Sequence, residues 1–119
     1  MADHLPKFKP GQAVTFGATA AITGGQVVEV SGDRTVAPAG AASAKAIGTA
    51  GHDVASGGKL VVHLAGPVDT AKAAAAVLAG AKVEAGAAGT VRTATTGLVL
   101  GIALTAAADA GDVIEFVRA

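Results

Sequence analysis

The chain has 119 residues, which is enough for one domain. Alanine (31 residues) and glycine (17 residues) together make up 48 positions, so about two-fifths of the chain has almost no side chain with which to build a core. Nine acidic residues balance nine basic ones and cysteine, tryptophan and tyrosine are absent, which argues against a nucleic-acid-binding protein and excludes disulfides and thiolate metal sites.

The first ten residues are a charged, proline-containing arm. Pro6 and Pro10 disfavour a helix, so we expect an extended segment, and Leu5 and Phe8 are the side chains suited to anchor it on a partner's sheet edge. The predicted partner-binding residues are Leu5, Pro6, Lys7, Phe8, Lys9 and Pro10. The arm lacks the apolar run of a secretory signal, and no stretch reaches about 20 continuous apolar residues, so we expect a soluble chain without its own export signal.

A short phrase recurs along the chain: a turn with glycine, usually a polar residue, and then a β-branched run. Its five copies are residues Pro10–Phe16, Gly24–Val30, Gly57–Leu64, Ala79–Glu84 and Ala110–Phe116. Glycine supplies the backbone freedom for a tight turn, and valine-rich runs favour a strand. The phrase predicts an all-β fold, and it leaves open whether this is a small β-barrel or a β-sandwich.

The phrase also belongs to a longer internal repeat. The matched stretches are Gly25–Val36 with Gly80–Val91 at an offset of 55, and Ile47–Ala50 with Leu100–Ala103 and Gly58–Val62 with Gly111–Glu115 at an offset of 53. We interpret the matches as two similar β-units, about residues 24–64 and 79–117, packed within a single β-domain of residues 11–119 that follows the arm of residues 1–10. The alternative is chance matching among common residues, against which the matched Glu29/Glu84 and Thr35/Thr90 count.

One segment between the two units has helical character. Residues 71–79 are mostly alanine, Thr70 is suited to cap the amino end, and Gly80 suits the position after the last turn. We therefore expect one short helix that joins the units and packs on the sheet.

The side chains give little support for catalysis. His52 and Asp53 are candidates for a base and its orienting carboxylate, and Ser31, Ser43 and Ser56 are candidate nucleophiles. Neighbours on an extended chain point to opposite faces, however, and no serine lies in a Gly-x-Ser-x-Gly sequence. We expect no enzyme, and a small enzyme that uses His52 and Asp53 is kept as an alternative.

Cofactor and metal sites are not indicated either. The three histidines have unrelated spacings, and Gly57-Gly58-Lys59-Leu60 lacks the serine or threonine of a phosphate-binding loop. We therefore expect no cofactor and no metal. A neutral β-domain with small side chains and an extended arm is suited to covering or joining other proteins, and a core this poor in large residues favours an oligomer.

The sequence resembles the small capsid decoration, or head cement, proteins of tailed bacteriophages. The segments that carry the resemblance are Pro10–Phe16, Ala21–Val28, Gly66–Val68, Gly101–Leu104 and Ala110–Ile114, and it spans roughly residues 9–118. It implies a β-rich virion protein, made in the host cytoplasm, that binds the outside of the head as a homotrimer and clamps neighbouring subunits of the major capsid protein, without catalysis and without a nucleic-acid or membrane partner. A receptor- or carbohydrate-binding β-module on a virion or cell surface is the alternative, against which the scarcity of aromatic residues counts.

Overall fold

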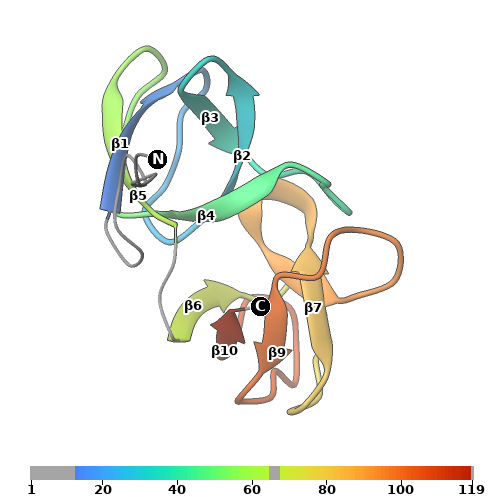
Figure 1. Cartoon of the computed structure of the whole chain (residues 1–119). Coiled ribbons are helices and arrows are strands. Elements are labelled where there is room, and N and C mark those ends of the chain that lie inside the picture. Colours follow the sequence, from blue (N-terminus) through green and yellow to red (C-terminus); the bar gives the residue numbers. More distant parts are fainter. Residues whose placement is uncertain (1–12, 65–67, 119) are drawn as a thin grey trace, which may run out of the picture.

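The first half of the chain folds into a closed β-barrel. The computed structural model describes residues 13–64 and 68–118. The first five strands are β1 (Ala13–Ala18), β2 (Val27–Gly32), β3 (Thr35–Pro38), β4 (Ala46–Ala50) and β5 (Lys59–His63). They close in the order β1-β3-β2-β4-β5, with β1 parallel to β3 and every other pair antiparallel (Figure 1).

The second half forms a five-stranded sheet below this barrel in Figure 1. Its elements are β6 (Val68–Lys72), β7 (Lys82–Ala85), the single-turn helix η1 (Ala87–Gly89), β8 (Val91–Thr93), β9 (Gly101–Ala103) and β10 (Val113–Arg118). The strand order is β6-β10-β9-β7-β8, so β6 and β8 form the two edges. The all-β prediction is confirmed, and a strand begins within each of the five turn-and-strand phrases.

The predicted helix over residues 71–79 is wrong. Residues 68–72 form strand β6, which pairs with β10 from Val68↔Val117 to Lys72↔Val113, and a turn follows. Alanine's helix propensity is overridden by tertiary packing, because alternate residues of the segment, Ala71 and Ala73, are buried in the core. Among the described residues the only helix is η1.

Corresponding strands of the two halves pair in the same register. The pair Gly17↔Lys59 of the first half has its counterpart in Lys72↔Val113 of the second half. The pair Thr49↔His63 likewise corresponds to Ile102↔Val117. Each position of the second sheet can therefore be compared with an equivalent position of the first barrel.

The division into an arm of residues 1–10 and one β-domain of residues 11–119 stays a prediction.

One part of the predicted alignment is off by one residue. Gly57 and Gly111 take the same turn position, with φ of 88° and 92°, so the offset of the last strand is 54 and not 53. This register places the buried Leu60 over the buried Ile114. Because alternate residues of a strand face opposite sides, a slip of one residue would exchange the two faces. Both strands are apolar at several successive positions, so composition alone did not fix their register.

The second sheet stays open where the first barrel closes. In the first half Gly17↔Thr35 and Ala18↔Val36 join β1 to β3. The counterpart between β6 and β8 is the single bridge Ala73↔Val91. Gly17 permits the close approach, because a Cβ there would lie 3.3 Å from Thr35 Cγ2. Its counterpart in β6 is Lys72.

The two halves share one of the two hydrophobic clusters. One cluster fills the first barrel and includes Val28 and Leu60. The other is centred on Ile114 and Phe116 of β10 and also includes Val27, Ala39 and Ala46 from the first half. Val27 and Val28 are neighbours on β2, so this strand is buried on both faces and contributes to both clusters.

No helix in the described part of the chain is long and apolar enough to cross a membrane.

Candidate binding surface

The predicted arm lies outside the described residues. This applies to all six partner-binding candidates, Leu5, Pro6, Lys7, Phe8, Lys9 and Pro10. Their role as a binding element therefore stays a prediction, and the described surface has to be searched for other docking features.

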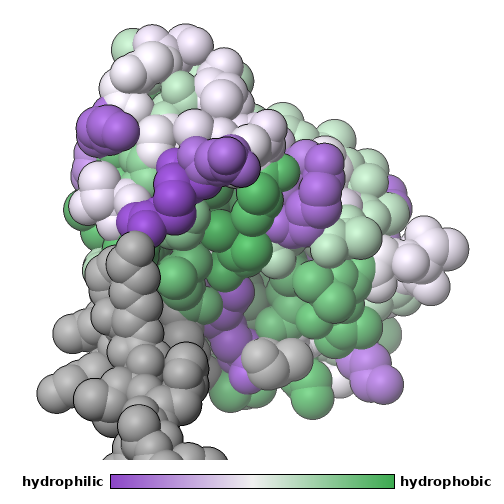
Figure 2. Space-filling view, turned by 45° about the horizontal axis from the view of Figure 1, so that its top comes forward, coloured by the Kyte–Doolittle hydropathy of each residue, from purple (hydrophilic) through white to green (hydrophobic). Residues whose placement is uncertain are grey.

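Large exposed apolar side chains are concentrated in the second half. Among the described residues the first half exposes only Val30 in this class. The second half exposes Val68, Leu78, Leu98, Val99, Ile102, Leu104, Val113 and Val117. A contiguous exposed apolar surface marks a site of interaction in most soluble proteins. Figure 2 shows hydrophobic surface gathered in the middle and lower parts of the molecule, whereas the upper lobe is mostly pale and hydrophilic.

Three of these side chains form a row across the outer face of the second sheet. Val68 of β6 pairs with Val117 of β10, which pairs with Ile102 of β9, and the three are 48%, 36% and 44% exposed. They point outward because Ile114 and Phe116, at the alternate positions of β10, fill the core. We call the residues Val68, Ile102, Leu104, Val113 and Val117 the apolar face.

The first barrel has no such row at the equivalent positions. Ala13, His63 and Thr49 take the places of Val68, Val117 and Ile102. Thr49 is buried, and its hydroxyl donates to Asp69 Oδ2 of the second half at 2.9 Å. These equivalent positions therefore differ between the two halves. In the first half they contribute to the contact between the halves, and in the second half they are apolar and exposed.

Exposed charges of both signs accompany the apolar face. Lys72 of β6, Glu115 of β10 and Lys82 of β7 are exposed, and Lys82 pairs across the sheet with Ile102. None of them belongs to an ion pair in the described part of the chain, where the pairs are Lys45–Glu29, Arg92–Glu84 and Arg118–Asp69.

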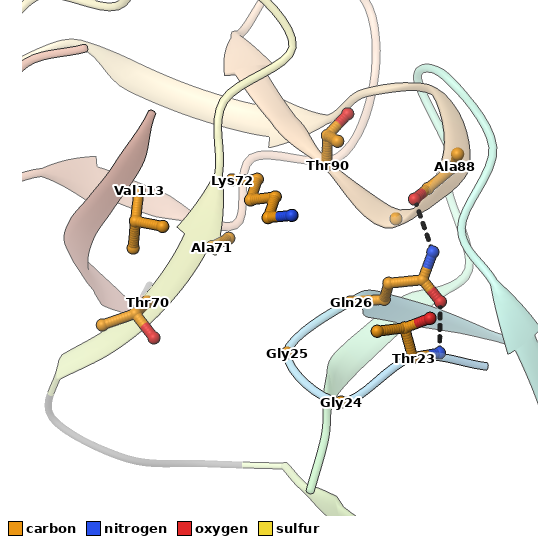
Figure 3. Close-up of a pocket in the computed structure, with 11 residues that line it drawn as sticks. Thr23, Gly24, Gly25, Gln26, Thr70, Ala71, Lys72, Ala88, Thr90 and Val113 are labelled. Carbon is orange, nitrogen blue, oxygen red and sulfur yellow. Dashed lines mark hydrogen bonds between the residues drawn. The ribbon is translucent and has the colours of Figure 1, made fainter. Parts of the chain in front are cut away.

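A cleft of about 370 Å³ lies beside the apolar face, between the two halves (Figure 3). Its walls are Thr70–Lys72 of β6, residues 23–26 of the first half, residues 88–90 before β8, and Val113. Gln26 ties the walls together, since its Nε2 donates to the Ala88 carbonyl at 2.9 Å and its Oε1 accepts from the Thr23 N–H at 2.8 Å. Lys72 alone is charged among the described lining residues, and none of them is aromatic.

Glu84 fixes the loop that carries Leu98 and Val99. Its Oε1 accepts the backbone N–H groups of Thr95, Thr96 and Gly97 at 2.6, 3.0 and 2.9 Å. The Arg92 guanidinium reaches Oε2 at 2.8 Å. The N–H groups of Thr95 and Gly97, aided by Arg92, lower the pKa of this carboxyl from 4.5 to about 2 although burial opposes the shift. The loop is thus held by a carboxylate that stays ionised.

Glu29 does the same in the first half, more weakly. Its Oε1 accepts the Gly40 N–H at 2.9 Å, which is the counterpart of the Thr95 bond, and Lys45 lies 3.7 Å from Oε2. The Gly40 N–H is also the main cause that lowers the pKa of Glu29. The matched glutamates of the repeat therefore share a structural role, which their match in the sequence did not reveal.

The side chains proposed for catalysis do not converge. His52 Nδ1 lies 3.0 Å from the Asp53 backbone carbonyl oxygen, and His52 Nε2 accepts the Val61 N–H at 3.2 Å. The Asp53 carboxylate instead accepts the Gly24 N–H at 2.7 Å, so the two residues form no base–carboxylate pair. The described residues hold no cluster of three or more histidine, aspartate or glutamate side chains placed to bind a metal.

The serine candidates serve local structure. Ser31 Oγ lies 2.8 Å from Thr19 Oγ1, Ser43 Oγ accepts the Lys45 N–H, and Ser56 Oγ donates to the Thr19 carbonyl.

Sequence reasoning missed the apolar face. The signal was present in Val113–Val117, where apolar residues occupy both faces of one strand and only one face can enter the core.

Comparison with known proteins assigns the chain to a family. Residues 8–118 match the family model described as phage cement protein. Curated protein sequences give no match. The fold is similar to that of the crystal structure of the head fiber gp8.5 N base in bacteriophage phi29, with a TM-score of 0.75 and 18% identity over 91% of this chain and 93% of that chain. Because the family match includes every described strand, this chain belongs to the phage cement protein family.

Proposed function

We propose that the protein is a capsid decoration protein that binds the outer surface of a phage head. In this role it stabilises contacts between subunits of the major capsid protein and has no catalytic activity. The observation that carries the proposal is the family match over residues 8–118. The engagement of His52 and Asp53 by separate backbone groups supports a structural role.

Self-association through the apolar face is part of the proposal. Exposed valine, leucine and isoleucine side chains on one sheet are costly in water, and a second copy of the face would cover them. The exposed Lys82 and Glu115 beside them provide opposite charges for a neighbouring copy. We propose a homotrimer, as the resemblance to head decoration proteins implies, in which the apolar face of each copy packs against its neighbours around the three-fold axis. The arm around Leu5 and Phe8 would then be available to the shell.

Two measurements test this function. Analytical ultracentrifugation of the purified protein should give three times the chain mass. Co-sedimentation with undecorated heads should recover the protein with the heads, and decorated heads should retain their DNA at higher temperature than undecorated ones. A monomer that stays in the supernatant would refute the proposal, and binding to glycans instead of heads would favour the carbohydrate-binding alternative.

A further inference from the structure

Strand β6 has one unpaired edge. Ala73 N donates to the Asp112 carbonyl at 2.8 Å on the β10 side, and Ala74 N donates to the Val91 carbonyl at 2.7 Å on the β8 side. Backbone groups of successive strand residues point to opposite sides, so those of Thr70 and Lys72 point toward β8 and away from β10. On that side β8 meets the β6 segment only beyond the strand, at Ala73.

The first barrel pairs the equivalent edge. There Gly17 N donates to the Arg34 carbonyl at 2.9 Å. The corresponding groups in the second half are Lys72 N and the Gly89 carbonyl, and no hydrogen bond joins them. Gly89 N instead donates to the Ala39 carbonyl of the first half at 2.9 Å. The first half thus holds residues 88–90 away from β6 and keeps the second barrel open.

The cleft runs along this free edge. Thr70 and Lys72 form one wall, and Ala88 and Thr90 form the facing wall (Figure 3). The volume of the cleft, about 370 Å³, is in the range of clefts that enclose a ligand. In the first barrel β3 pairs with this edge, whereas its counterpart β8 meets the β6 segment only at Ala73, so the edge of β6 along Thr70 and Lys72 lacks a strand partner.

The charge in the cleft indicates what such a strand would carry. Lys72 is the charged lining residue, and its side chain extends from β6 into the space beside Gln26 in Figure 3. None of the ion pairs among the described residues uses it. A lysine on an open edge deters indiscriminate pairing with other strands, and a carboxylate on the incoming chain removes that penalty.

We propose that an extended, carboxylate-bearing segment of a shell subunit adds as a strand to the free edge of β6. The backbone of β6 supplies the hydrogen bonds, Lys72 receives the carboxylate, and the added strand lies in the cleft between β6 and residues 88–90. This inference rests on the proposed function and adds to it the place and the chemistry of the contact.

Hydrogen exchange provides the first test. The probe is undecorated heads, and exchange is compared between the free protein and the head-bound protein. The amides of Thr70 and Lys72 should exchange at least about tenfold more slowly on the heads, because these edge amides gain a partner. Amides of residues 13–18 are the matched control, since Gly17 N is already paired in the free protein. Self-association through the apolar face is present in both samples and does not contribute to the difference.

Charge reversal provides the second test. Lys72→Glu should weaken head binding about tenfold, through the lost attraction and the new repulsion. Lys59→Glu is the control, because Lys59 is an exposed lysine at the end of β5 in the first barrel. Both variants should keep the mass of the unmodified protein in solution.

The outcomes separate this inference from the proposed function. Normal binding to heads with unchanged exchange at Thr70 and Lys72, or equal binding by the two lysine variants, overturns the strand-addition proposal and leaves the decoration role in place. A protein that does not bind heads at all overturns both.

Discussion

Glu84 shows how one buried residue can organise a surface. Its two oxygens receive three backbone N–H groups and a guanidinium, so the loop of residues 95–97 has no freedom to fold over the sheet. An acceptor of this kind is costly to remove, because three partly buried N–H groups would lose their shared partner. The charge itself also contributes, since Arg92 needs a counter-ion.

Replacement of Glu84 should therefore destabilise the protein in a graded way. Glu84→Ala removes every acceptor and should lower the urea midpoint most, and Glu84→Gln keeps one carbonyl oxygen and should lower it less. Glu29→Gln is the control and should have the smallest effect, because Glu29 is partly exposed and accepts a single backbone bond. A larger loss in Glu29→Gln than in Glu84→Ala would contradict this account.

The pH dependence has a defined sign. The pKa of Glu84 is lowered in the folded protein from 4.5 to about 2, so its contribution to stability is fully present above pH 4.5 and is lost as the pH falls toward 2. The free energy of unfolding of the unmodified protein should decrease across this interval more than that of Glu84→Gln. Urea titrations at both ends of the interval measure the difference, and parallel curves would show that the ionised Glu84 is not involved.

Two glycines at equivalent positions permit the closest strand approaches. A Cβ at Gly48 would clash with the His63 carbonyl oxygen, and one at Gly101 would clash with the Val117 carbonyl oxygen. Gly101→Ala should cost about 2 kcal/mol of stability through the forced backbone shift. Gly40→Ala should stay within about 0.5 kcal/mol, because a Cβ there meets only Glu29 Oε1 at 3.9 Å. Equal unfolding midpoints for the two variants would rule out the proposed clash.

At the level of elements, sequence patterns located strands better than they excluded helices. The glycine-plus-valine phrase predicted β1, β2, β5, β7 and β10, because turn chemistry and β-branched residues are local signals. Strand β6 was missed, since Thr70–Gly80 reads as a good helix until β10 offers it a partner and the core accepts Ala71 and Ala73. No local pattern contains that information.

The apolar face belongs to the same level, because it arises from three adjacent strands. Ile102→Glu should lower the mass in ultracentrifugation from trimer to monomer and leave the far-ultraviolet circular dichroism unchanged, because Ile102 is outside the core. Val30→Glu is the matched control on the first half, because Val30 is the only large apolar side chain that is exposed in the described part of that half. A trimer that survives Ile102→Glu would place self-association on another surface.

At the level of the whole molecule, the arm can be tested apart from the folded domain. Deletion of residues 2–9 should reduce binding to undecorated heads, because it removes the predicted anchors Leu5 and Phe8. The number of subunits in solution and the thermal midpoint should be unchanged, since the deleted residues precede β1. Undiminished binding by the shortened protein would refute the role of the arm.

The sequence predicted the all-β class and the matched Glu29 and Glu84, but it did not predict how the halves combine. The repeat offsets of 55 and 53 could be read from the sequence. The correct alignment of β5 with β10 could not, because it depends on which valines and isoleucines face inward. The open edge of β6 was equally hidden. It depends on Gly89 turning to Ala39, a contact between residues 50 positions apart that leaves no trace in composition.

The burial of β2 on both of its faces has a mechanical consequence. Val28 packs inside the first barrel and Val27 packs inside the second cluster, so removal of β2 from either one disrupts the other. A molecule stretched between its ends should therefore not extend in two separate stages, one for each half. Under an increasing force it should stay folded up to a single threshold and then unfold completely in one cooperative step.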